Sequence, residues 1–254
     1  MSRNGPDLLT VAPQMVSGLA FAATETALKP IYAPLDPVWL RARLREGLQI
    51  RMLRRPDHGL VLFCPGQMAW RPIQGAAPFV VVHDMRVLPG PCAAAHTARL
   101  WRSVEEWACY FGYAGVVALS GDADGFIAPE RVPPRHYTCV DDNQFGARLI
   151  ARVLRGPVAL PRLPRDWTRR AAGLGSGVVV QCTGETGRLA ARAERVLRVA
   201  ERRGVPARVD CFDSAAEVQA RAGHPAAVFA VYRDGVPHGG PETTDAQLRA
   251  WIKA

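Results

Sequence analysis

Residues 86–100 read RVLPGPCAAAHTARL and contain a loop of small residues. It joins a strand-like run, VVVHDMRVL in residues 80–88, to a helix-like run, ARLWRSVEEWACYFG in residues 98–112. A small-residue loop between a strand and a helix commonly holds a phosphate, because the first N–H groups of the helix lack partners and its dipole favours an anion. The stretch therefore predicts either a phosphate-binding loop or a tight turn with closely packed alanines.

Two buried parallel strands are predicted around this loop, in residues 77–88 and 115–120, with a helix over 93–111 between them. A further helix is predicted over 36–46, with Pro37 in its first turn and Val38, Trp39, Leu40 and Leu44 on one side. Other apolar runs predict strands over 48–53, 59–64, 137–140 and 147–153, the first pair flanking the turn sequence RRPDHG. The last two are expected to form a closing antiparallel pair.

Residues 156–177, GPVALPRLPRDWTRRAAGLGSG, are rich in Pro, Gly and Arg and lack a steady hydrophobic period. We interpret residues 156–176 as a linker between one domain over 1–155 and another over 177–254. The second domain shows a regular order of predicted elements: strand 177–182, helix 188–203, strand 205–212, helix 214–222, a hairpin on Asp234-Gly235 and helix 244–253. This βαβ–α–ββ–α order is the thioredoxin-like arrangement.

The composition of the 254 residues is that of a soluble globular protein, with 48% hydrophobic residues and no apolar run long enough to span a membrane. The first residues lack the apolar core of a signal peptide, so we expect a cytoplasmic location. The net charge of +9 is carried almost entirely by arginine. Because these arginines are scattered and accompany no nucleic-acid-binding motif, nucleic acid is not an expected partner.

Six cysteines stand at positions 64, 92, 109, 139, 182 and 211, and no two are spaced as CxxC. This spacing argues against a zinc ribbon and against a dithiol redox pair. We expect most of the cysteines to be small buried apolar residues.

Several segments carry a resemblance to a known family. In chain order they are Leu9-Thr10 before LAFAAT (19–24), EGLQIRML (46–53), GQMAWRPI (66–73), HYTCVDD (136–142), ERRGVPARV (201–209) and HPAAVFAVYRDG (224–235). In this order they resemble the YoaP-type acetyltransferases of the GNAT superfamily, and GQMAWRPI is the most specific match. The resemblance implies an α/β protein with a GNAT-fold mixed sheet domain and a small C-terminal thioredoxin-like domain. It further implies an acyl-CoA-dependent N-acyltransferase that uses acetyl-CoA on a small-molecule or peptide amine.

The family's CoA loop reads Q/R-x-x-G-x-G/A, and its counterpart here is Gly90-Pro91-Cys92-Ala93-Ala94-Ala95. Only Ala95 matches a family position. Ala93 adds a methyl group where a glycine is expected, and Pro91 removes an N–H donor. Arg86 and Arg99 are nearby cations that can compensate in part. The resemblance implies that the cofactor-binding residues are Met85, Val87, Gly90, Cys92, Ala93, Ala94, Ala95, His96 and Arg99.

Transfer to an amine needs a base for the amine and an acid for the leaving thiolate. Tyr137 is the candidate acid, and its alternative role is a strand residue with its ring in the core. His83 is the candidate base, and its alternative is a hydrogen-bonded structural histidine. Asp84 adjoins it, and Glu130 is a solvated carboxylate by default. The backbone N–H groups around 84–86 are expected to hold the oxyanion.

Cys182 ends the first strand of the second domain, where a thioredoxin-like fold places its first active cysteine. TGET follows, so we expect no resolving cysteine, and Pro225 falls where such folds have a cis-proline. The alternative to a reactive Cys182 is a degenerate thioredoxin-like module used for docking or dimer contacts. The alternative to an enzyme, for the whole chain, is a GNAT-fold binding protein that serves a partner protein. A weaker third hypothesis, transfer from aminoacyl-tRNA, depends only on the positive charge. Trp70 is interpreted as a packing anchor, and residues 18–24 lack the cysteines of the family segment.

Overall fold

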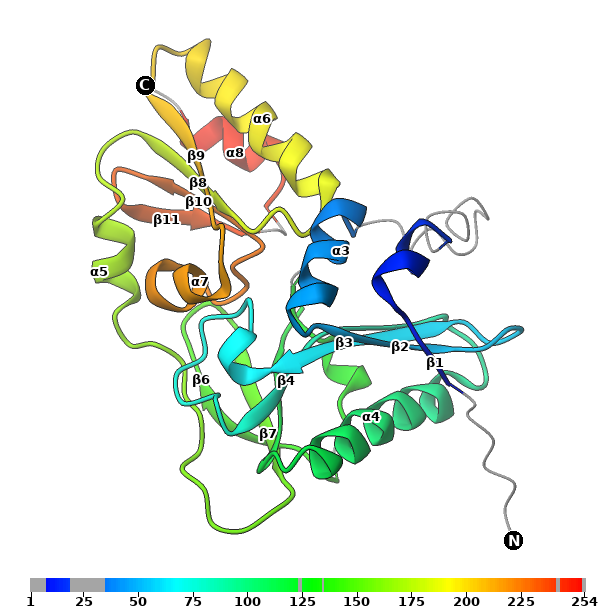
Figure 1. Ribbon diagram of the computed structural model, residues 1–254. Coiled ribbons are helices and arrows are strands. Elements are labelled where there is room, and N and C mark those ends of the chain that lie inside the picture. Colours follow the sequence, from blue (N-terminus) through cyan, green and yellow to red (C-terminus); the bar gives the residue numbers. More distant parts are fainter. Residues whose placement is uncertain (1–7, 19–34, 123–124, 134, 241–242, 253–254) are drawn as a thin grey trace, which may run out of the picture.

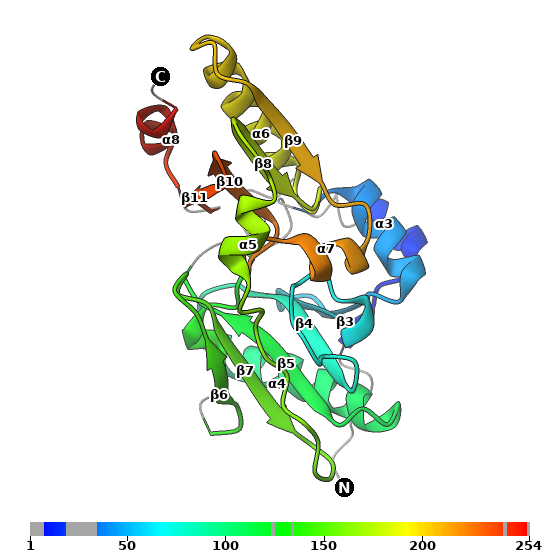
Figure 2. The same ribbon diagram turned by 90° about the vertical axis from the view of Figure 1, so that its left-hand side faces the viewer.

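The computed structural model describes residues 8–18, 35–122, 125–133, 135–240 and 243–252. They form two separate β-sheets, and helices cover the faces of both (Figures 1 and 2). The larger, seven-stranded sheet has the order β1-β2-β3-β4-β5-β7-β6. Its strands are β1 (Leu8–Thr10), β2 (Gln49–Leu53), β3 (Gly59–Pro65), β4 (Phe79–Val87), β5 (Gly115–Ser120), β6 (Thr138–Asp142) and β7 (Arg148–Val153).

Neighbouring strands of this sheet are antiparallel except β4 and β5, which are parallel. Helix α4 (Ala93–Tyr110) connects these two strands, as the sequence predicts. The predicted closing pair is also confirmed, because β6 and β7 pair antiparallel. The large sheet is therefore mixed, and its single parallel pair lies where the small-residue loop occurs.

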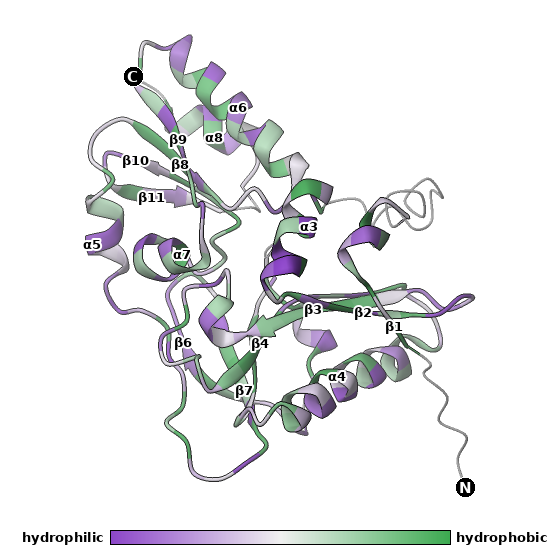
Figure 3. Ribbon diagram, in the orientation of Figure 1, coloured by the Kyte–Doolittle hydropathy of each residue, from purple (hydrophilic) through white to green (hydrophobic). Residues whose placement is uncertain are grey.

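The two faces of the large sheet are covered by different helices (Figure 1). The apolar side of α4 packs on one face through Leu100, Trp101, Val104 and Ala108, against Val61, Phe63, Val80 and Val82 of the strands. Helix α3 (Pro37–Glu46) covers the other face with Leu40 and Leu44. In Figure 3 the interior strand β3 is mostly green, the edge strand β6 carries purple residues, and helix α4 carries both green and purple residues.

Helix α3 begins where the sequence predicts, because the Asp36 carboxylate accepts hydrogen bonds from the N–H groups of Val38 and Trp39, both at 2.8 Å. One detail of the prediction is wrong. Val38 is 70% exposed and does not share the buried side with Leu40 and Leu44. Val38 lies in the first turn of the helix, and its side chain faces solvent.

The smaller sheet has four strands in the order β11-β10-β8-β9. Strands β8 (Val178–Cys182) and β9 (Ala207–Cys211) are parallel, whereas β10 (Phe229–Arg233) is antiparallel to both β8 and β11 (Val236–Gly239). Asp234 and Gly235 form the predicted hairpin with φ of 51° and 75°. The predicted order strand, helix, strand, helix, hairpin, helix is confirmed.

Helices lie on both faces of the smaller sheet, which gives three layers (Figure 2). Helices α6 (Gly187–Glu201) and α8 (Asp245–Trp251) pack on one face, with Leu189, Ala193, Leu248 and Ile252 in the core beside Val178, Val180 and Phe229. Ala171 of helix α5 (Trp167–Ala172) packs on the other face against Val179, Ala230 and Tyr232. Helix α7 (Ala215–Arg221) is capped by Ser214, whose hydroxyl accepts the Glu217 N–H at 3.2 Å.

The segment interpreted as a linker contains a short helix, α5 (Trp167–Ala172), that sequence reasoning missed. Arg162 pairs with Gln74 in an isolated antiparallel bridge, and Leu163 and Trp167 are buried. Three further short helices, of 3₁₀ type, are η1 (Pro13–Met15), η2 (Gly66–Met68) and η3 (Pro129–Arg131). The residues between the two sheets are thus packed against both of them.

Candidate active site

The two parallel strands of the large sheet separate beyond Val82 and Ala118, and we call the gap between them the wedge. On its β5 side Ile127 forms a parallel bridge with Ser120, so β4 is the strand whose edge is left without a strand partner. The pairing of β4 with β5 runs from Phe79–Gly115 to Val82–Ala118 and stops there, although both strands continue. His83 is the extra residue of a β-bulge, since Asp84 pairs with Leu62 and Val82 with Phe63 of β3. Bulges bend a strand and re-aim its groups, and they are frequent beside functional sites. Strand β4 therefore loses its pairing with β5 at the residue where it bulges.

The backbone groups of Met85 and Val87 face the open side of this wedge. The N–H of Leu88 donates to the His58 carbonyl oxygen at 3.1 Å, which places residue 88 in a hydrogen-bonded pair. Because such pairs alternate along an antiparallel ladder, the backbone groups of residues 84 and 86 bond to β3 and those of 85 and 87 turn away. Two of the predicted cofactor-binding residues therefore present backbone groups, while both side chains are buried under α4.

Arginine side chains occupy two carbonyl oxygens of this open edge. Arg131 in η3 donates from Nη1 to the Met85 oxygen at 2.6 Å, and Arg71 donates from Nη2 to the His83 oxygen at 3.3 Å. The Trp101 indole N–H of α4 in turn donates to the Arg131 carbonyl at 2.7 Å. The short helix η3 is thus fastened across the wedge from both sides.

The N-terminus of α4 is open to solvent. Its N-cap residue, Cys92, makes no side-chain cap, and the Ala93 N–H donates to the Gly90 carbonyl at 3.1 Å. Ala94 and Ala95 occupy the second and third helical positions, where N–H groups have no acceptor within the helix, and both residues are exposed. A side chain at Gly90 would meet no atom within 4 Å. The corner is therefore an uncrowded turn with donors available.

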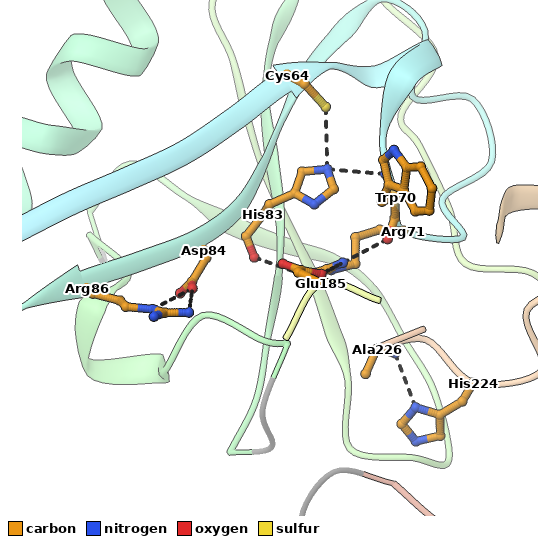
Figure 4. Close-up of polar contacts among 9 residues, drawn as sticks. All are labelled: Cys64, Trp70, Arg71, His83, Asp84, Arg86, Glu185, His224 and Ala226. Carbon is orange, nitrogen blue, oxygen red and sulfur yellow. Dashed lines mark hydrogen bonds and ion pairs between the residues drawn. The ribbon is translucent and has the colours of Figure 1, made fainter. Parts of the chain in front are cut away.

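The cations expected beside this corner are held elsewhere. Arg86 donates from Nε to the Asp84 carboxylate at 2.6 Å, and His96 lies 3.3 Å from the Asp57 carboxylate in the β2–β3 turn. Figure 4 shows Asp84 and Arg86 together, apart from the group around His83. These acidic partners reduce the positive charge available to a phosphate at this helix end.

His83 is 2% exposed and lies in a polar group beneath the surface (Figure 4). Its Nε2 accepts the backbone N–H of Trp70 at 3.2 Å and lies 3.4 Å from the Cys64 sulfur. The ring proton is therefore assigned to Nδ1, which has no hydrogen-bond partner among the described residues. Burial, assisted by the Arg71 charge, holds the pKa of His83 well below 6.5. This environment corresponds to the structural histidine named as the alternative.

A buried ion pair joins the two halves of the chain beside His83. Arg71 is 1% exposed and Glu185 4%, and Nη1 of Arg71 lies 3.1 Å from Oε2 of Glu185. Arg71 also donates to the Trp70 carbonyl at 2.8 Å. The segment that carries Arg71, residues 66–73, begins at Gly66, which lies close to Ala76. A Cβ added at Gly66 would lie 1.9 Å from the Ala76 carbonyl oxygen. Nothing in the sequence indicated that Arg71 and Glu185 would meet.

Tyr137 lies in the core under α4, not in the wedge. Its hydroxyl donates to Glu105 Oε1 at 3.1 Å, and its ring lies 4.5 Å from that of Trp101. Burial and the Glu105 carboxylate raise its pKa well above 10. This is the packing alternative, and it leaves the phenol without access to a thiolate. Glu130 is exposed in η3, as expected by default.

Trp70 fills the role of a packing anchor. It is buried with Phe212, Val218 and Ala222 of the second half, and its ring meets the Trp39 ring edge-on at 5.7 Å. The Arg43 guanidinium lies 4.4 Å from the Trp70 ring centroid.

Three expectations about the cysteines and Pro225 are wrong. Cys182 has a partner thiol, because Cys211 Sγ lies 2.8 Å away on the adjacent strand. Cys92, Cys139 and Cys211 are exposed, because they lie in a loop and on two edge strands, so most of the six are not buried. The cis bond among the described residues is Arg55–Pro56, so the buried Pro225 follows a trans bond, in a turn where Ala226 N–H donates to His224 Nδ1 at 3.2 Å.

The comparisons with known proteins give two solved structures. A GNAT family acetyltransferase from Brucella melitensis, in complex with acetyl-CoA, is 17% identical over 62% of this chain and 95% of its own, with a TM-score of 0.37. A ribosomal-protein-alanine N-acetyltransferase of the same organism is 15% identical over 58% and 99%, with a TM-score of 0.38. Neither a scan of protein-family models nor a search of curated proteins found a match. Because both TM-scores are low, the evidence for the architecture is the order and direction of the strands described above.

Two features are absent from the residues that the structure describes. None of their helices is both long and apolar enough to cross a lipid bilayer. They also bring together no cluster of three or more His, Cys, Asp or Glu side chains with the geometry to hold a metal ion.

Proposed function

We propose that the chain is an acyl-CoA-dependent N-acyltransferase that transfers an acetyl group to an amine. The observation that carries the proposal is the wedge between β4 and β5, which leads directly into the open N-terminus of α4. A free strand edge can pair with amides of an extended ligand, and the helix end can bind its phosphates. We further propose GNAT and thioredoxin-like folds for residues 1–155 and 177–254, joined by 156–176.

The residues present fit acetyl-CoA in part. The N–H groups of Ala94 and Ala95 would hold the pyrophosphate, and the backbone groups of Met85 and Val87 would pair with the pantetheine amides. Pro91 supplies no donor, Arg86 is bound by Asp84, and Arg131 must release the Met85 carbonyl. These features predict weak rather than absent binding. Acetyl-CoA, when bound, supplies the activated acyl group.

Asp84 is the side chain that we propose to meet the acceptor amine. It directly follows the bulge residue and is half-buried, and its carboxylate is held by Arg86. A carboxylate in this position can accept a proton from an ammonium group and orient the amine. The Met85 N–H, on the open edge, is the proposed oxyanion donor. His83 and Tyr137 are left with structural roles because both are buried and hydrogen-bonded.

The first test is acetyl-CoA binding followed by thermal unfolding. A ligand at 100 times its Kd should stabilise the native state by about 2.7 kcal/mol. Ala94→Glu should abolish this gain because it places a negative charge at the phosphates, although the same charge favours the helix N-terminus by about 0.3–1 kcal/mol. Ala94→Gln is the matched control of similar size without the charge, and it should retain binding.

The second test is turnover. Release of free CoA in the presence of amines, from spermidine to peptide N-termini, should be lost in Asp84→Asn with binding of acetyl-CoA preserved. Binding without turnover on any amine would reject the enzyme and favour the binding-protein alternative. No stabilisation at millimolar acetyl-CoA would also reject the enzyme, and would favour a GNAT-fold protein that serves a partner protein without binding CoA.

A further inference from the structure

Cys182 and Cys211 lie side by side in the smaller sheet. They are the last residues of β8 and β9 and are opposite each other in the parallel register. Their sulfur atoms are 2.8 Å apart, and both cysteines are free. Parallel neighbours are about 4.8 Å apart, which lies within the Cα separation of about 4.4–6.8 Å that a disulfide requires. A bond between the two can therefore close with little movement of the strands.

The two thiols differ in access to solvent. Cys211 is exposed on an edge strand, whereas Cys182 is 3% exposed. Burial and the contact with Cys211 raise the pKa of Cys182 to about 12, so it stays protonated at neutral pH. The neighbouring carboxylate, Asp210, is occupied by Gln181 Nε2 at 3.0 Å and by Arg221. A reagent in solution thus meets Cys211 first, with Cys182 directly behind it.

We propose that Cys182 and Cys211 form a thiol–disulfide exchange site for low-molecular-weight disulfides. The Cys211 thiolate attacks one sulfur of the small disulfide, whose S–S bond breaks, and the first half leaves as a thiolate that takes up the proton released by Cys211. The Cys182 sulfur then attacks Cys211 Sγ in the mixed disulfide and expels the second small thiol, which takes up the Cys182 proton. One small disulfide is reduced to two thiols, and the protein pair is oxidised to one disulfide.

The order of the two steps follows from the geometry. The attacking thiol must be reachable, which holds for Cys211 and not for Cys182. The resolving thiol must contact the mixed disulfide at once, which the 2.8 Å separation provides. The Phe212 N–H donates to the Cys182 carbonyl at 2.9 Å and keeps the two strand ends aligned. The site thus differs from a CxxC motif because its two thiols come from neighbouring strands.

The test uses the full chain and oxidised glutathione as the probe. After native incubation and blocking of free thiols, a non-reducing tryptic digest should contain peptide 171–188 linked to peptide 209–221. Dithiothreitol should separate them and restore both thiols. A lasting glutathione adduct on Cys211 with a free Cys182, or no link at all, would overturn the proposal.

Substitutions at the two cysteines test which thiol attacks the small disulfide and which one resolves the mixed disulfide. Cys182→Ser should accumulate the glutathione adduct on Cys211, and Cys211→Ser should leave Cys182 unmodified. Cys139→Ser is the matched control, an exposed cysteine on the edge strand β6, and should form the 182–211 link as the wild type does. If a variant does not fold, the reversible link in the wild-type protein still decides. A link from either peptide to the Cys92 peptide instead would count against a dedicated pair.

Discussion

His83 shows how burial fixes the charge state of one side chain. The imidazole is neutral in the folded protein because its pKa lies well below 6.5, with burial as the main cause and the Arg71 charge as the second. In the unfolded chain the pKa returns to about 6.5. Below that pH the unfolded state binds a proton that the folded state does not. The stability that His83 contributes is therefore present above about pH 6.5 and lost as the pH falls below it.

The expected result is a stability difference that urea unfolding can measure. Between pH 6.5 and the folded pKa, the wild type should lose up to about 1.4 kcal/mol per pH unit from this residue. His83→Gln, which can still accept the Trp70 N–H, should show a shallower decline on acidification. His136→Gln, at an exposed histidine, is the control and should keep the wild-type slope. Equal slopes for all three proteins would contradict the assignment.

Single residues also mark the limit of what the sequence could predict. The helix start at Pro37 and the hairpin on Asp234-Gly235 were predicted, because helix starts and hairpin turns depend on neighbours along the chain. The contact of Cys182 with Cys211 was not readable, because it depends on the register of two strands that are far apart in sequence. The burial of His83 and Tyr137 likewise depends on which face of the sheet each strand residue meets.

At the scale of elements, η3 lies across the wedge and competes with a ligand for β4. Arg131 donates to the Met85 carbonyl, and Trp101 holds the Arg131 backbone in place. Arg131→Ala should free this carbonyl for a pantetheine amide while Trp101 still anchors η3. Because a hydrogen bond to a charged group contributes about 1.5–3 kcal/mol, the Kd for acetyl-CoA should fall about ten-fold or more.

Isothermal titration of Arg131→Ala beside Arg135→Ala measures this effect. Arg135 is exposed four residues beyond η3, and its loss should leave the Kd at the wild-type value. Weaker binding in Arg131→Ala would show that the guanidinium contacts the ligand instead of excluding it.

Elements with a clear period were predicted, and elements stabilised by distant contacts were not. Helix α4 and strand β4 carry long apolar patterns and were found within two residues of their bounds. Helix α5 has only six residues and lies in a Pro- and Gly-rich segment, and its Trp167 is buried against Phe145 of the β6–β7 loop. Tertiary contact, not local propensity, stabilises this helix.

For the whole molecule, the ion pair Arg71–Glu185 is the polar link between the two sheets. Glu185 also accepts the Asp36 N–H with its backbone oxygen at 2.9 Å, so three segments meet there. Gln219 of α7 adds a donor to the Ala69 carbonyl at 3.0 Å. Apolar contacts continue on either side, since Trp70 packs with Phe212 and Val218. The two halves should therefore unfold together.

Removal of one partner tests this coupling. Glu185→Ala leaves the Arg71 guanidinium buried without its counter-charge and should cost about 3–5 kcal/mol in urea unfolding. Replacement of both, Arg71→Met with Glu185→Leu, removes the stranded charge and should recover most of that loss. Glu194→Ala is the control, because the Glu194 carboxylate is exposed on α6 and its ion pair with Arg198 is loose, at 3.7 Å. This change should alter the free energy of unfolding by less than about 0.5 kcal/mol. Two separate transitions in the wild type, or a Glu185→Ala loss no larger than that of the control, would show that the halves are independent.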